Sequence, residues 1–234
     1  MAPERSGLRR PMPGRPRRPG RAGQVDQADQ AGQADRTGRA GPDRHRAALA
    51  TGMFVLYVAS IAGANWMISH VGRPVSGAHV LPVWPGLYAP SGVYLAASTF
   101  VARDLLQRLA GIRAGLAAIV LGAAVSWAVS SSTLALASGA TFALSESCDF
   151  LVYTPLQARH FPFAVAGSGL VSDLVDSTVF LTLAGIPLAA ALPGQLVGKA
   201  WVVIGGGVVA GALRRVGPFR SSPQRPLLAA APGS

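Results

Sequence analysis

The stretch "AALATGMFVLYVASIAGANWMISHVG", residues 47–72, contains no charged side chain over 26 residues. An α-helix needs only ~20 consecutive apolar residues, each adding ~1.5 Å, to cross the hydrocarbon core of a bilayer. Charged residues make up about a quarter of a typical soluble domain, but they make up only 13% of this 234-residue chain. The stretch therefore predicts a membrane protein and its first span.

Further windows with few or no charges predict five more spans. Residues 74–102 have room for a loop and then a span, which we expect to start near residue 87. The 45 residues between Arg113 and Arg159 have room for two spans, and residues 160–213 for two more, the last from about Gln195. The predicted fold class is all-α, a six-span transmembrane helical bundle that ends near residue 213.

Both tails differ from the bundle in composition. Residues 1–46 contain eleven Arg and five acidic residues, with a loose repeat in "GQVDQADQAGQAD" and few aliphatic side chains. Such a segment cannot bury enough apolar surface to offset its chain entropy, so we expect a disordered Arg-rich cytoplasmic tail. Its charge suits the anionic inner membrane face; a start codon annotated too far upstream is the alternative. Residues 214–234 are expected to form a second disordered tail, and residues 47–213 the membrane domain.

The basic residues predict the orientation of the bundle. Positive side chains accumulate in cytoplasmic loops. The tails and the loops between spans lie alternately on the two sides of the membrane. The side that includes the N-terminal tail holds nearly all the basic residues outside the spans, and the loops on the other side hold only Arg73. Outside the tail, the basic residues on the first side are Arg103, Arg108, Arg113, Arg159, Arg214, Arg215, Arg220 and Arg225. We therefore expect a multi-pass protein of the plasma membrane with both termini in the cytoplasm. This placement also argues against a nucleic-acid partner.

Five ionisable side chains lie inside the predicted spans. Each costs on the order of 3 kcal/mol at mid-depth, or roughly 15 kcal/mol together, which is comparable with the whole stability of a domain. We therefore expect them to face one another, water or a ligand, in a polar cavity between spans one, four, five and six that opens outward. The five are Glu146, Asp149, Asp173, Asp176 and Lys199.

Helical spacing selects the candidate substrate-binding residues, because side chains three or four positions apart share a face. Glu146 and Asp149 have this spacing, and Tyr153 extends their face. Asp173 and Asp176 repeat the spacing on the fifth span, and the sixth span adds Gln195 and Lys199. The candidates are Asn65, Trp66, Glu146, Asp149, Tyr153, Asp176, Gln195 and Lys199. Structural or gating roles are expected for Arg103, Asp104 and Asp173. A plain structural Asp176–Lys199 ion pair remains an alternative.

Other kinds of site are not expected. Cys148 is the single cysteine, so the chain has no internal disulfide. No pair of histidines has convincing metal-ligand spacing, and there is neither a phosphate-binding glycine loop nor a nucleophile elbow. We expect no enzyme, no cofactor and no metal.

Five short stretches in order resemble one transporter family. They are "GANW" (63–66), "FVARDLLQ" (100–107), "SESCDFLVYTPL" (145–156), "DLVDSTVF" (173–180) and "PGQLVGKAW" (193–201). Together they are similar to the actinobacterial branch of the vitamin uptake transporter family, also called the queuosine precursor transporter family. The resemblance covers about residues 47–213. It departs from the family early in the fifth span, where Ser168-Gly169 stands in place of a Ser-Asn pair.

The resemblance implies a six-span inner-membrane importer of 7-deazaguanine precursors of queuosine. It implies a fold similar to the substrate-binding components of energy-coupling-factor transporters. By position, the family's motif residues fall on Asn65, Arg103, Asp104, Glu146, Asp149, Asp176, Gln195 and Lys199. The expected partners are a small-molecule substrate, the lipid bilayer and, in one alternative, an energising module.

A purine-like ligand also suits these side chains. Its adjacent ring N–H and amino groups can donate to one carboxylate, and its exocyclic oxygen can accept from Lys199, Gln195 or Asn65. Trp66 or Tyr153 could stack on its flat face. Two alternatives to an independent transporter stay open: a vitamin-binding membrane subunit that depends on a separate ATP-driven module, and a structural or regulatory membrane protein.

Overall fold

The structure is a computed structural model that describes residues 21–75, 78–130 and 135–220. It has two compact units, residues 1–42 and residues 43–234. In the first unit, the described residues belong to a helix. The second unit contains the rest of that helix, six further helices and a small sheet.

Helix α1 (Arg21–His70) begins inside the segment for which the composition predicts disorder. Residues 21–46 of that segment lie in α1, and residues 1–20 lie outside the described residues. Ala, Gln and Arg, which are frequent there, are good helix formers. Extending an existing helix also avoids the unfavourable nucleation step. At the other end, residues 217–220 form a short helix within the predicted second tail, and residues 221–234 are not described.

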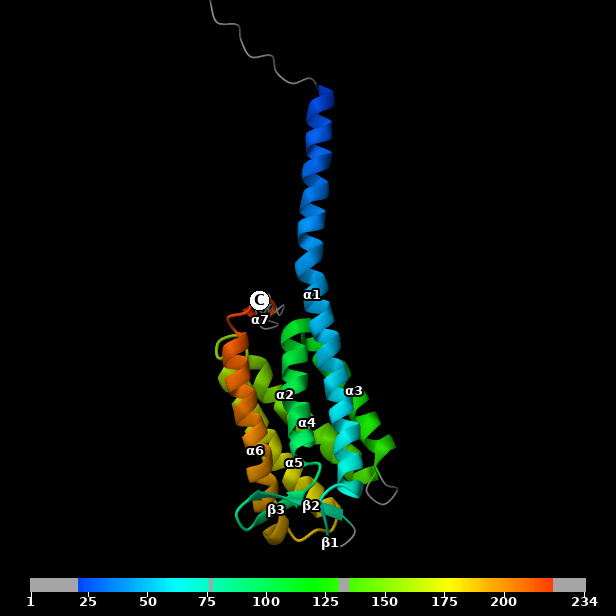
Figure 1. Ribbon diagram of the computed structural model, residues 1–234, viewed down its shortest axis with the longest axis vertical. Helices are drawn as coiled ribbons and strands as arrows, with labels where there is room; N and C mark the ends of the chain where they lie inside the picture. The colour runs from blue at the N-terminus through cyan, green and yellow to red at the C-terminus, as the bar shows by residue number, and fades with distance from the viewer. Residues whose placement is uncertain (1–20, 76–77, 131–134, 221–234) are drawn as a thin grey trace, which may run out of the picture. The chain divides into compact units, whose positions relative to one another are not determined.

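The helices that follow α1 form a bundle with short connections (Figure 1). They are α2 (Val93–Ala110), α3 (Ile112–Val129), α4 (Ala135–Leu156), α5 (Phe161–Leu183), α6 (Leu188–Leu213) and α7 (Gly217–Arg220). Helix α5 packs most extensively against α4 and α6. Tyr57 and Ile61 of α1 pack in a buried cluster with Leu106 of α2, Ala118 of α3 and Phe142 of α4.

Four helices of the described chain are long and apolar enough to cross a membrane. They are Arg44–His70, Ile112–Val129, Phe161–Leu183 and Leu188–Leu213. The surface of the bundle is also apolar, because large side chains project outward from several helices. Examples are Val120, Leu151, Phe163 and Val208, each at least 70% exposed. A soluble monomer rarely exposes so much apolar surface, so the predicted helical membrane bundle is confirmed in this coarse form.

Helices α2 and α4 are not among these four apolar helices. Helix α2 carries Arg103, Asp104 and Arg108, and helix α4 carries Glu146 and Asp149. All five side chains are buried in the bundle. The two helices therefore place their polar faces inside the protein, where other side chains can satisfy them.

A three-stranded antiparallel sheet follows α1, where we expected only a loop. Its strands are β1 (Arg73–Val75), β2 (Ala78–Trp84) and β3 (Leu87–Pro90), in the order β1-β2-β3. The frequent prolines of this segment hide the strand pattern, since proline is depleted in strands. Because β3 occupies residues 87–90, α2 begins at Val93 rather than near residue 87.

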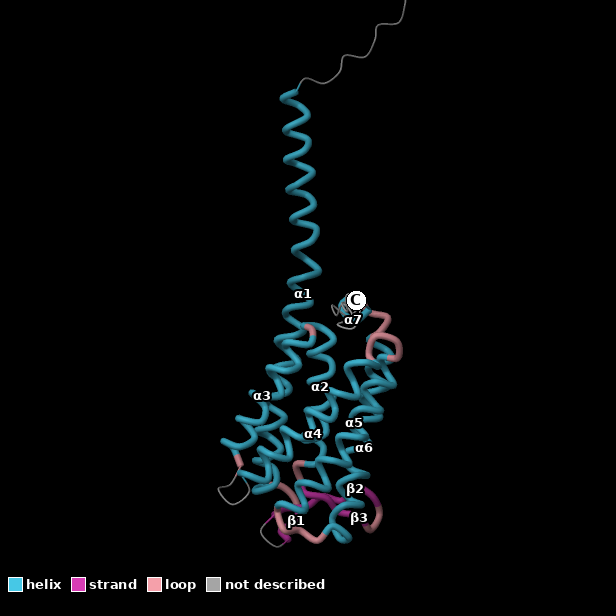
Figure 2. The backbone as a smooth tube through the Cα atoms, turned by 180° about the vertical axis from the view of Figure 1, so that it is seen from behind, coloured by secondary structure: helices cyan, strands magenta, loops and turns pink. Residues whose placement is uncertain are grey.

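The sheet lies at one end of the bundle and packs on α6 (Figures 1 and 2). A Cβ added at Gly194 of α6 would lie only 1.9 Å from the carbonyl oxygen of Tyr88. Glycine therefore permits this close approach of helix and strand. Helix α6 starts at Leu188 rather than Gln195, since the sequence "LAAAL" is a strong helix former and continues into the span.

The two ends of the bundle carry different side chains. At the sheet end lie Trp66 of α1, Trp127 of α3, and Trp84 of β2, which stacks on Trp201 of α6 with ring centroids 5.9 Å apart. All four tryptophans are more than half exposed. The opposite end carries exposed arginines in the connections and after α6: Arg113, Arg159, Arg214, Arg215 and Arg220.

Candidate functional site

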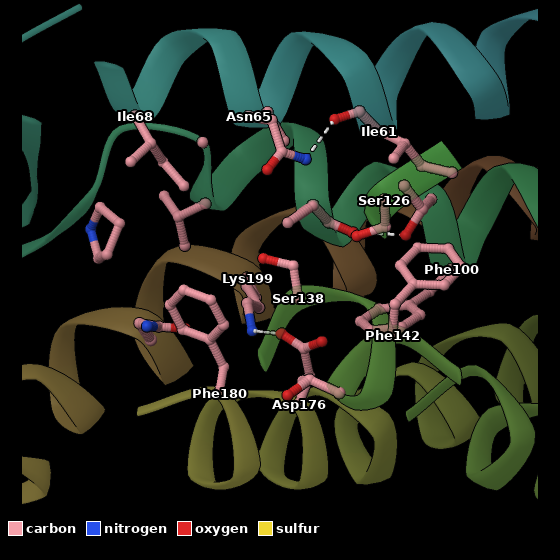
Figure 3. Close-up of a pocket in the computed structure, with 18 residues that line it drawn as sticks. Ile61, Asn65, Ile68, Phe100, Ser126, Ser138, Phe142, Asp176, Phe180 and Lys199 are labelled. Atoms are coloured by element: carbon pink, nitrogen blue, oxygen red, sulfur yellow. Dashed lines mark hydrogen bonds and ion pairs between the residues drawn. The ribbon is translucent and has the colours of Figure 1, made fainter. Parts of the chain in front are cut away.

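A pocket opens among helices α1 to α6 near the sheet end of the bundle (Figure 3). Its volume is about 90 Å³. Pro90 of β3 and Gly92 form part of its wall. Its polar lining consists of Asn65, Thr99, Ser126, Ser138, Thr141, Asp176, Gln195 and Lys199.

Lys199 is the only basic side chain that lines this pocket among the described residues, and it is almost fully buried. Its Nζ lies 2.6 Å from Asp176 Oδ2 and 3.4 Å from Asp173 Oδ1, and it donates to the Ser177 hydroxyl at 2.8 Å. The Asp176 side chain keeps 19% of its surface exposed, against 2% for Asp173. Asp176 is therefore the carboxylate of this group that a ligand can reach.

Asn65 and Gln195 add amides to the pocket. Asn65 Nδ2 donates to the Ile61 carbonyl at 3.0 Å, and its Oδ1 accepts from the Ser130 hydroxyl at 2.9 Å. Asn65 is thus partly engaged in joining α1 to the end of α3. The Thr141 hydroxyl is buried in the lining, and among the described residues it has no hydrogen-bond partner.

Phenylalanines form the aromatic part of the pocket. Figure 3 shows Phe180 on one side of the Lys199–Asp176 pair and Phe142 on the other. Trp66 is absent from the lining: it is 57% exposed and stacks on the His70 ring, with centroids 4.8 Å apart. The prediction that Trp66 faces the pocket is wrong, because its helical face points outward.

Tyr153 does not reach the pocket either. It is fully buried, and its hydroxyl donates to the Asp104 carbonyl at 2.8 Å. This hydrogen bond ties α4 to α2 within the bundle interior. The prediction of an aromatic platform made by Tyr153 is therefore wrong.

A second polar group, which we call the Arg103 cluster, consists of Arg103, Asp104, Glu146, Asp149 and Gln107. The Arg103 Nε donates to Glu146 Oε2 at 3.0 Å, and its Nη2 to Asp149 Oδ2. Its Nη1 lies 3.0 Å from Gln107 Oε1 and 3.2 Å from Asp104 Oδ1. Every member is 0% exposed, and none lines the pocket.

The structure thus separates the candidates into two groups. Asn65, Asp176, Gln195 and Lys199 line the pocket, whereas Glu146 and Asp149 belong to the Arg103 cluster. The prediction of one cavity shared by Glu146, Asp176 and Lys199 is wrong. Arg103 of α2 binds Glu146 and Asp149 of α4. Lys199 of α6 binds Asp173 and Asp176 of α5.

The two groups are nevertheless adjacent. The Ser145 hydroxyl donates to Asp176 Oδ1 at 3.1 Å, while the next residue, Glu146, binds Arg103. Thr99 of α2 lines the pocket and lies beside Glu146. One turn of α4 therefore connects the pocket to the Arg103 cluster.

Sequence reasoning missed several pocket residues. Ser138, Thr141 and Phe142 lie on one face of α4, with Ser145 a turn further on. Their spacing of three and four residues is a helical signal, and hydroxyls in a membrane helix tend to face other helices. That pattern could have identified them.

Comparison with protein-family models, with curated proteins and with solved structures finds no match to this chain.

Proposed function

We propose that this protein is a six-span membrane transporter that imports a small nitrogenous solute, and that the solute is a 7-deazaguanine precursor of queuosine. The observation that carries the proposal is the Lys199–Asp176 ion pair in the wall of the bundle pocket, with a carboxylate that remains accessible. The Asp176 side chain is 19% exposed and lines the pocket, so a ligand can reach it. The queuosine assignment draws on the motif resemblance.

The pocket chemistry suits such a ligand. Asp176 can accept together from a ring N–H and an adjacent amino group, and Lys199 or Gln195 can donate to an exocyclic oxygen. Phe142 and Phe180 provide flat apolar faces for the ring, and stacking of this kind contributes ~1–3 kcal/mol per base. A solute that lacks the amino group leaves the buried carboxylate unpaired, which gives discrimination.

The proposed count of six spans consists of the four apolar helices together with α2 and α4. Neighbouring helices enclose the charged side chains of α2 and α4. The motif resemblance implies a fold similar to the substrate-binding components of energy-coupling-factor transporters. Tryptophan is enriched at membrane interfaces and arginine at cytoplasmic ends. These preferences support an orientation with the sheet end and its pocket outside, and with both termini in the cytoplasm of a plasma-membrane protein.

A cell that depends on external precursor provides the test. The gene should restore queuosine in tRNA, and Lys199→Met and Asp176→Asn should abolish this when the variants are compared at equal amounts of protein in the membrane. Trp66→Phe is the matched control, because Trp66 lies outside the pocket. Failure of the well-inserted wild-type protein would rule out this solute. A host without an ATP-driven vitamin module would also test the alternative of a dependent binding subunit.

A further inference from the structure

The Arg103 cluster has more acidic than basic groups. Asp104, Glu146 and Asp149 surround one guanidinium, and all four side chains are 0% exposed. If every carboxyl were ionised, the cluster would carry two uncompensated negative charges away from water. A buried group in that position takes up a proton rather than staying charged.

Hydrogen-bond donors are missing at the same place. Asp104 Oδ2 accepts from Ser168 at 3.3 Å and Asp149 Oδ2 accepts from Arg103. Among the described residues, however, Asp149 Oδ1 has no hydrogen-bond partner, and Asp104 Oδ1 has only its ion pair with Arg103 Nη1 at 3.2 Å. The two carboxylates bind neighbouring nitrogens of one guanidinium, Asp104 at Arg103 Nη1 and Asp149 at Arg103 Nη2. Carboxyl groups that share one buried site share a proton, because both cannot ionise side by side.

The neighbouring groups that the structure describes do not supply the missing positive charge. Helix α1 brings Tyr57, α4 brings Tyr153, and α5 brings the hydroxyls of Ser168 and Ser172. Arg108 of α2 is engaged with the Gln157 and Phe219 carbonyls. On α6, Lys199 is bound by Asp173 and Asp176.

The pocket contacts this cluster through two consecutive residues of α4. Ser145 donates to the pocket carboxylate Asp176, and Glu146 binds Arg103. A solute that binds the Asp176 carboxylate competes with the hydrogen bond that Ser145 donates to it. That competition occurs at the residue next to Glu146, which binds Arg103.

We infer that Asp104 and Asp149 share an exchangeable proton and that the protein imports its solute together with protons. The proton comes from water on the outside, rests on a carboxyl oxygen of the pair and leaves to the cytoplasm. The inference concerns the energy source and rests on the proposed function.

Infrared difference spectroscopy of the purified full-length protein tests the proton site without any solute. The protonated-carboxyl C=O band should disappear when pH is raised and should shift in D₂O. Asp149→Asn and Asp104→Asn should each remove it, and the matched control Asp173→Asn, from the Lys199 group, should keep it. A band that is absent from the wild type, or unchanged in both cluster variants, overturns the inference. The use of two variants allows for the failure of one to fold.

Proteoliposomes loaded with wild-type protein test the coupling. Accumulation of labelled 7-deazaguanine should require an acidic exterior and stop with a protonophore, while Asp149→Asn should keep solute exchange but lose accumulation. Accumulation that follows a sodium gradient, or is indifferent to pH, overturns proton coupling. If the solute is not carried at all, the proposed function fails, and the infrared band alone decides on the proton site.

Discussion

Lys199 of α6 binds Asp176 of α5, with its Nζ 2.6 Å from Asp176 Oδ2, in the wall of the bundle pocket. The pair joins two helices and presents a carboxylate to the cavity. Structural and ligand-binding roles therefore coincide at one contact, and the predictions below are designed to separate them.

Lys199→Met leaves Asp173 and Asp176 without their cation. Removing one partner of a buried ion pair costs about 3–5 kcal/mol, and we expect the lower end because Asp176 is partly exposed. Adding Asp173→Asn should restore at least ~1 kcal/mol of this loss, since the two sites are in contact. Thermal unfolding in detergent measures both. Recovery of stability without recovery of uptake identifies a ligand-binding lysine, whereas recovery of both identifies a purely structural one.

Arg103→Gln should destabilise the protein more than Lys199→Met does. It leaves three carboxyl groups, all fully buried, without their guanidinium, and we expect a loss of about 5 kcal/mol. Arg103→Lys keeps the charge but cannot reproduce the planar set of donors of the guanidinium. Its stability should therefore lie between that of the wild type and that of Arg103→Gln. The amount of folded protein in the membrane and its melting temperature measure the order. An Arg103→Gln protein as stable as the wild type would contradict the assigned role.

Ser145→Ala removes the hydrogen bond between α4 and Asp176. The loss of one hydrogen bond costs about 1 kcal/mol of stability, and uptake should fall because Asp176 loses its orientation. Ser147→Ala is the matched control, since Ser147 is exposed and donates, within the described part of the chain, to the Ala143 carbonyl of its own helix. Uptake assays at equal membrane levels compare the two, and equal activity would refute a role for Ser145.

Gly194→Ala should displace the sheet from α6. The added methyl would lie 1.9 Å from the Tyr88 carbonyl oxygen, and overpacking of this kind costs about 1–3 kcal/mol. At Gly205 an added Cβ meets nothing within 4 Å, so Gly205→Ala should be neutral or slightly stabilising. Melting temperatures of the two variants test the packing, and equal values would contradict it.

The orientation can be tested with single cysteines in a Cys148→Ala background. Arg73 lies in the exposed β1 and Arg159 in the exposed connection between α4 and α5. Arg73→Cys should react with a membrane-impermeant maleimide in intact cells, and Arg159→Cys only after permeabilisation. The reverse labelling would invert the topology and place the pocket at the cytoplasmic side.

The local sequence was sufficient for the helical bundle and for the list of polar residues inside it. Runs without charge predict spans because a charge in hydrocarbon is costly, and i, i+3 spacing puts Asp173 with Asp176 and Glu146 with Asp149 on common faces. It was not sufficient for the small sheet, whose strands contain Pro74 and Pro82. Strand pairing depends on partners from other segments, and these prolines obscure the alternation.

Only the tertiary structure decided which positive group each acidic pair meets. Helical periodicity states which side chains share a face, but the rotation of each helix against its neighbours determines where that face points. That rotation sends Glu146 and Asp149 to Arg103, and Asp173 and Asp176 to Lys199. It also turns Trp66 outward and brings Phe142 and Phe180 to the pocket. Packing between helices is a property of the whole bundle, so the division into a pocket and a separate Arg103 cluster is not encoded in any single stretch.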